Sequence, residues 1–134
     1  MFENFRLIQK ALIEKDGKFL AIKRSDYTSY CPHTWELPGG QVEFGEDLAK
    51  ALEREVEEET SLKISTNGPL ITNSSMAKGI YIVGIIYKCD YLSGDVNLSD
   101  EHTDYKWVSK KELLDLDLSD WMAESLHNFF TPES

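Results

Sequence analysis

The sequence is poor in cysteine and in long apolar segments. Its two cysteines, Cys31 and Cys89, are far apart and lack the Cys-x-x-Cys spacing of redox and zinc motifs. Neither a disulfide nor a zinc framework is therefore expected, and both residues are interpreted as reduced thiols. The longest unbroken apolar run covers residues 80–87, far short of the roughly 18 to 20 residues that cross a membrane. No membrane-spanning helix is predicted.

Basic residues are also scarce. The chain has 14 lysines and arginines against 24 aspartates and glutamates, and its formal net charge is -10. A long polyphosphate such as a nucleic acid is repelled by this charge and is not an expected partner. A small phosphate ligand remains compatible with it, because a divalent cation held by clustered carboxylates inverts the local charge.

The length and composition suit one folded unit. With 134 residues, of which 41% are apolar, residues 1–134 are predicted to form a single domain. Residues 1–6 show neither a basic leader nor a long apolar stretch, so a cytoplasmic protein is expected. The sequence leaves the oligomeric state open, and a homodimer is among the assemblies that it allows.

The apolar pattern alternates between strand and helix signals. Residues 5–13 and 18–24 have β-like spacing around an Asp16-Gly17 turn, which predicts a β-hairpin. A loop over residues 25–33 and a short strand before Gly39 follow, and Asp47 is expected to cap a helix to about residue 60. Further strands are predicted over residues 62–65, 79–92 and 104–108, separated by turns at 67–69 and 93–95, with late helices over 110–114 and 121–130. The result is an α+β or α/β sandwich with mixed strands.

The helix over residues 47–60 carries acids on its apolar side. At about 100° per residue, Glu55, Glu58 and Glu59 fall on or beside the side of Ala51 and Leu52. An ordinary Glu-rich helix would place its acids on a solvated face, supported by charge pairs. Carboxylates that repel one another near a core require a proton or a cation, and hard oxygen ligands select Mg²⁺, Mn²⁺ or Ca²⁺.

Residues 40–62 resemble the Nudix box, G-x5-E-x7-R-E-U-x-E-E-x-G-U, in which U is apolar. The matching residues are Gly40, Glu46, Arg54, Glu55, Val56, Glu58, Glu59 and Leu62. Residues 35–39 and 105–108 are also similar to the MutT-like members of this family. The resemblance implies an α/β/α sandwich in which helices flank a mixed sheet, and an enzyme that hydrolyses a diphosphate linkage with the help of Mg²⁺, or of Mn²⁺.

The resemblance also implies the roles of single residues. It makes Gly39, Glu55, Glu58 and Glu59 metal ligands, the first through its carbonyl oxygen. One of Glu55, Glu58 and Glu59, or a late acid, would be the catalytic base. Glu101 is the candidate for that late acid, although a solvated loop acid explains it equally well. Arg54 would orient the glutamates, and its alternative is a surface ion pair. Glu46 is either a supporting ligand or a favourable charge at the helix start.

Four further expectations concern the surroundings of the box. Ser61 occupies the position of the second box glycine, and the family turn would place it in a left-handed conformation at a cost of about 1 kcal/mol. His33 and His102 are interpreted as loop histidines rather than catalysts. Tyr30, Trp35 and Phe44 could stack on a base, but core packing is favoured for Trp35.

The substrate follows by elimination within the family. The proline typical of the ADP-ribose subgroup is absent from residues 75–78, Tyr81 lies slightly too far along for the dinucleoside subgroup, and the coenzyme A signature is missing. The favoured activity is hydrolysis of a nucleoside triphosphate to a monophosphate and pyrophosphate. Alternatives are a Nudix hydrolase for ADP-ribose or a nucleotide sugar, and a non-catalytic nucleotide-binding module. Besides an enzyme and a nucleotide-binding module, a third class of function is a purely structural acidic domain.

Overall fold

A computed structural model describes residues 4–26 and 31–130 of the protein. Its elements follow the chain in this order: β1 (Phe5–Lys15), β2 (Lys18–Arg24), β3 (Trp35–Glu36), β4 (Gly39–Gln41), α1 (Leu48–Thr60), β5 (Lys63–Ala77), β6 (Ile80–Ser93), β7 (His102–Val108), α2 (Lys110–Asp115) and α3 (Asp120–Phe130). The predicted mixture of hairpin, acidic helix, long strands and late helices is confirmed.

The strands form one mixed sheet. Its order is β3-β2-β1-β6-β5, with β4 pairing beside β1 and β7 beside β2. The central β1 and β6 run parallel, whereas β1 with β2, and β5 with β6, are antiparallel. The predicted Asp16-Gly17 turn joins β1 to β2, and both of its residues have positive φ.

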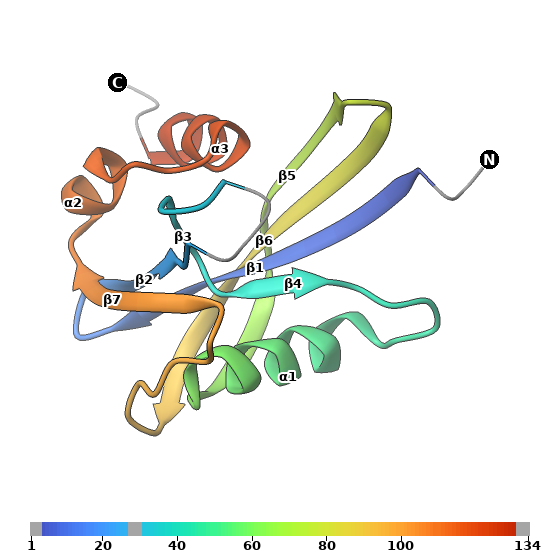
Figure 1. Ribbon diagram of the computed structural model, residues 1–134. Coiled ribbons are helices and arrows are strands. Elements are labelled where there is room, and N and C mark those ends of the chain that lie inside the picture. The colour runs from blue at the N-terminus through green and yellow to red at the C-terminus, as the bar shows by residue number, and fades with distance from the viewer. Residues whose placement is uncertain (1–3, 27–30, 131–134) are drawn as a thin grey trace.

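Helices cover both faces of the sheet (Figure 1). Leu52 and Val56 of α1 pack with Ala11 and Ile13 of β1 in one buried cluster. The intervening Leu12 belongs to a second cluster, which α2 and α3 close from the other face. Because successive strand residues point to opposite faces, β1 contributes to both cores. The α/β/α sandwich is thereby confirmed.

Helix α1 starts and ends as the sequence predicts. The side chain of Asp47 accepts a hydrogen bond from the backbone N–H of Lys50, 3.1 Å away, and so caps the first turn. Ser61 ends the helix in the left-handed conformation, with φ 69° and ψ 10°. Its backbone N–H donates to the carbonyl of Glu57, which is the bond pattern that a glycine usually makes here.

The prediction for β5 is wrong in length. The turn expected at residues 67–69 is absent, and β5 continues to Ala77 beside β6. Gly68 and Pro69 instead lie where the pairing register shifts, and Gly68 has φ 125°. Such bulges accommodate both residues without ending a strand, since β5 lies at the edge of the sheet order and Pro69 need not donate to a further strand.

The described residues contain no helix that is both long and apolar enough to cross a membrane.

Candidate active site

A cavity of about 730 Å³ lies beside the amino-terminal half of β1. Arg6, Ile8 and Lys10 line it; as even-numbered residues they share the strand face of Leu12, which α3 covers farther along. Helix α1 contributes Glu55 and Glu59 to the wall. The cavity therefore combines cationic and apolar residues of the sheet with carboxylates of the box helix.

Two glycines bring the chain of β4 close to both β1 and α1. Gly39 has φ 145°, and a Cβ atom there would lie 2.1 Å from the carbonyl oxygen of Gln9. A Cβ atom on Gly40 would lie 2.7 Å from a carboxylate oxygen of Glu55. Only glycine fits at residue 39, and a side chain at residue 40 would displace the Glu55 carboxylate, so the pair lets α1 present its carboxylates directly against the strand.

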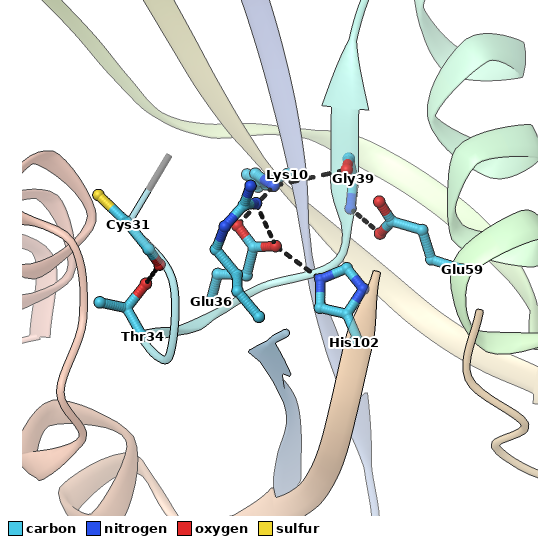
Figure 2. Close-up of polar contacts among 8 residues, drawn as sticks. Lys10, Cys31, Thr34, Glu36, Gly39, Glu59 and His102 are labelled. Atoms are coloured by element: carbon cyan, nitrogen blue, oxygen red, sulfur yellow. Dashed lines mark hydrogen bonds and ion pairs between the residues drawn. The ribbon is translucent and has the colours of Figure 1, made fainter. Parts of the chain in front are cut away.

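Glu59 is the most enclosed acid of the helix. The residue is 8% exposed, and its Oε1 accepts a hydrogen bond of 3.0 Å from the backbone N–H of Gly39 (Figure 2). Burial raises its pKa to about 7, although Lys10 and the Gly39 hydrogen bond oppose that shift. A carboxylate in this position gains from a cation beside it, or else holds a proton near neutral pH.

Glu55 and Glu58 are held through Arg54. The guanidinium lies 3.1 Å from Glu58, 3.5 Å from Glu55 and 2.8 Å from Glu46. Burial raises the pKa of Glu55; Arg54 opposes this effect and Glu58 adds to it. Arg54 therefore contacts three acids at once and fixes their relative positions, which goes beyond a single surface ion pair.

The three box glutamates are not equally placed. Glu59 is buried and Glu55 half-buried, and both line the cavity. The side chain of Glu58 is 60% exposed and is not among the residues that line the cavity. Glu55 and Glu59 therefore share the predicted face of the helix. Glu58 lies at the solvent-exposed edge of that face, next to Arg54.

Glu101 and His102 approach Glu59 from another segment. One potential ligand atom from each of these three residues lies within 4.8 Å of the others. Glu101 lines the cavity, as its proposed role requires, and it is exposed. His102 was expected in a loop, but it is the first residue of β7 and its ring is buried.

A charge network in the wall of the cavity, centred on the buried Glu36, was not predicted from the sequence. Glu36 accepts hydrogen bonds from Lys10 at 3.1 Å and Arg24 at 3.0 Å, and lies 2.7 Å from Nε2 of His102 (Figure 2). Burial alone would raise the pKa of Glu36, but Lys10, His102 and Arg24 together lower it to about 2. The only sequence signal was the position of Glu36, three residues before Gly39.

The aromatic candidates have different outcomes. Trp35 is buried in the cluster under α3, so the preference for core packing is confirmed. Phe44 is fully exposed and is not part of the cavity wall, and Tyr30 lies outside the described residues. Trp121 of α3, which the sequence analysis placed only in a helix, lines the cavity instead. Both cysteines are free thiols, as predicted.

Comparison with known proteins decides the family. The model of the NUDIX domain matches residues 10–129. The chain belongs to the NUDIX family. A nucleoside triphosphatase NudI from Escherichia coli O81 (strain ED1a) is similar to this Nudix protein, with 34% identity over 125 residues that cover 85% of this chain and 89% of the relative.

Solved structures agree with this assignment. A MutT protein from Methanosarcina mazei Go1 superimposes on the Nudix protein with a TM-score of 0.86 and 28% identity, covering 96% of this chain and 95% of that one. An Ap4A hydrolase from C. elegans reaches a TM-score of 0.70 with 26% identity over 93% of each chain. The protein is a MutT-like Nudix hydrolase, a pyrophosphohydrolase of a family that generally needs a divalent metal ion.

Proposed function

We propose that this Nudix hydrolase cleaves nucleoside triphosphates to a monophosphate and pyrophosphate with Mg²⁺ as its metal ion. The observation that carries this proposal is the division of the cavity. Its lining divides by chemistry into four carboxylates, of Glu36, Glu55, Glu59 and Glu101, and, besides glycines and small polar residues, two arginines, two lysines, three isoleucines and a tryptophan. A triphosphate and its nucleoside match such a division, since one is anionic and the other largely apolar.

The donor atoms fit a hard divalent cation. Glu55 and Glu59 both have pKa values raised by burial, so a cation would relieve the desolvation that these carboxylates suffer. We propose Glu55, Glu58, Glu59 and the carbonyl oxygen of Gly39 as the metal ligands. Oxygen donors of this kind bind Mg²⁺, and Mn²⁺ can replace it. When bound, the ion neutralises charge on the phosphoryl oxygens and activates water.

The remaining residues position these groups. Arg54 orients Glu55 and Glu58 through its ion pairs, and the backbone N–H of Gly39 holds Glu59. Glu101 is the proposed additional acid, placed to accept a proton from the attacking water or to join the ligands. Lys10 and Arg24 bring positive charge to the cavity wall, where it favours a polyphosphate.

The nucleoside end would contact the sheet and α3. Ile8, Ile80 and Ile82 line the cavity together with Trp121. Trp121 packs directly on the backbone of β6, where a Cβ atom on Gly84 would lie 2.8 Å from its ring. A flat aromatic and apolar surface of this kind suits a base, and the names of the relatives support a nucleotide.

A substrate panel tests the proposal. Purified protein with Mg²⁺ is given ribo- and deoxynucleoside triphosphates, ADP-ribose and nucleotide sugars, and the products are separated by ion-exchange chromatography. We expect the highest kcat/KM for a triphosphate, with monophosphate and pyrophosphate in equal amounts. A higher value for ADP-ribose or a nucleotide sugar would favour that specificity instead, and binding of all nucleotides without products would indicate a non-catalytic module.

A further inference from the structure

The ring of His102 has one nitrogen that lacks a partner among the described residues. Its side chain is 1% exposed, and Nε2 lies 2.7 Å from Glu36. Nδ1 is buried and makes no hydrogen bond within the part of the chain that the structure describes. A buried polar atom without a partner costs free energy and calls for a physical explanation.

The unpartnered nitrogen faces the acids of the active site. Figure 2 shows this nitrogen on the side of the ring toward Glu59, away from Glu36. One ring nitrogen of His102 and one carboxylate oxygen each of Glu59 and Glu101 lie within 4.8 Å of one another. Donors that share an ion at about 2.0 to 2.2 Å are separated by at most about 4.4 Å, so small side-chain movements would bring all three onto one ion.

Glu36 prepares the ring for this role. Lys10 and Arg24 both contact its carboxylate, which therefore acts as an acceptor toward Nε2–H of His102. In the neutral ring, a proton on Nε2 leaves the lone pair on Nδ1. A carboxylate behind an imidazole is the arrangement that orients metal-binding histidines in many proteins.

We propose that Nδ1 of His102 is a nitrogen ligand to the divalent ion of this active site, completing a donor set with Glu59 and Glu101. The inference rests on one part of the proposed function, namely that a divalent ion binds among the carboxylates of the Nudix box. It does not depend on which substrate is cleaved. An imidazole favours Mn²⁺ or Co²⁺ over Mg²⁺, because Mg²⁺ is a harder ion with a stronger preference for oxygen donors. The site would then bind Mn²⁺ more tightly than Mg²⁺ while still accepting either ion.

Pulsed EPR of Mn²⁺ bound to the full protein tests this directly. The chain has three histidines, so labelling with ¹⁵N-histidine marks few nitrogens. We expect a nitrogen coupling on Mn²⁺ that changes from the ¹⁴N to the ¹⁵N pattern on labelling. It should vanish in His102→Gln and persist in His33→Gln, whose side chain is 61% exposed and pairs with Asp26.

Affinities give a second readout. We expect His102→Gln to weaken Mn²⁺ binding by about 10- to 100-fold, and Mg²⁺ binding, measured by competition, by a smaller factor. Wild-type protein that binds Mn²⁺ without a histidine coupling, or that binds no Mn²⁺, would overturn the inference even if His102→Gln failed to fold. Triphosphate hydrolysis without the nitrogen coupling would support the proposed function and refute His102 as a ligand. A nitrogen coupling without hydrolysis would support the ligand and refute the proposed function.

Discussion

Glu57 and Glu59 are two positions apart on α1 and have opposite surroundings. Glu59 is buried against Gly39, whereas Glu57 is exposed and pairs with Lys63 at 2.8 Å. We expect Glu59→Gln to lower kcat by at least about 10²-fold, because it removes a charge that acts on the transition state. Glu57→Gln should change kcat by less than about twofold. Steady-state kinetics on both variants, with circular dichroism to check folding, measures the difference. Equal losses would refute the assignment of the helix faces.

Glu36 offers a test through stability and pH. Glu36→Gln leaves Lys10 and Arg24 without their shared carboxylate, so we expect a loss of about 3 to 5 kcal/mol in the free energy of unfolding at pH 7. The pKa of Glu36 is lowered to about 2, from an ordinary value of 4.5. The stabilisation is therefore complete above about pH 4.5 and disappears as the pH falls toward 2. Urea unfolding of both proteins across this range should show the gap closing. A gap that is constant with pH would contradict an electrostatic origin.

At the scale of the helix, substitutions of Ser61 can distinguish the effect of backbone strain on stability from that of the side-chain hydrogen bond. Its left-handed φ of 69° strains any residue with a Cβ atom, and its Oγ donates to the carbonyl of Asn97 at 3.1 Å. Ser61→Gly and Ser61→Ala both lose that bond, but only glycine relieves the strain. We expect the glycine variant to be more stable than the alanine variant by about 1 kcal/mol, measured by thermal unfolding, with metal affinity unchanged. Loss of metal affinity in Ser61→Gly would show that the hydroxyl has a specific role.

The two glycines of β4 are predicted to respond differently to substitution by alanine, one with a loss of stability and the other with a loss of activity. Ala at Gly39 would meet the backbone of β1, which cannot yield, so Gly39→Ala should destabilise the fold by at least about 2 kcal/mol. Ala at Gly40 would meet only the carboxylate of Glu55, which can move. Gly40→Ala should therefore fold normally and lose about 10-fold or more in kcat/KM. Parallel melting and kinetic measurements distinguish the two, and an unfolded Gly40→Ala would contradict this account.

The elements differ in how far local sequence predicts them. The extent and N-cap of helix α1 were predicted because its period and Asp47 act within a few residues, whereas the left-handed end at Ser61 was expected from the resemblance to the family box. The length of β5 was mispredicted, since Gly68 and Pro69 favour a turn locally, and only pairing with β6 converts them into bulges. The contact of Glu36 with His102 was not predicted either. It joins residues from β3 and β7, which meet only through their common neighbour β2.

On the scale of the whole molecule, the acidic charge predicts that stability depends on divalent ions. A net charge of -10 and the desolvation of Glu59, which Lys10 and the Gly39 hydrogen bond only partly offset, both oppose folding without a cation. We expect Mg²⁺ to raise Tm by several degrees in wild-type protein, and EDTA to reverse the rise. Glu59→Gln should show a much smaller shift, and NaCl at equal ionic strength controls for screening. If the variant and wild type respond alike, the ion acts on the general charge rather than on this site.

The parallel pairing of β1 with β6 also governs the order in which the chain can acquire its structure. Gln9 and Tyr87, hydrogen-bonded in the core, are 78 positions apart. During synthesis β1 therefore cannot pair with β6 until β6 has been made. The β5–β6 hairpin and α1, in contrast, form between residues that are close in the sequence. The cavity draws its walls from β1, α1 and β6 together. Glu55 and Glu59 are neighbours as soon as α1 forms, whereas Glu101 reaches Glu59 only after more distant parts of the chain have closed, when core packing can offset the repulsion between the acids.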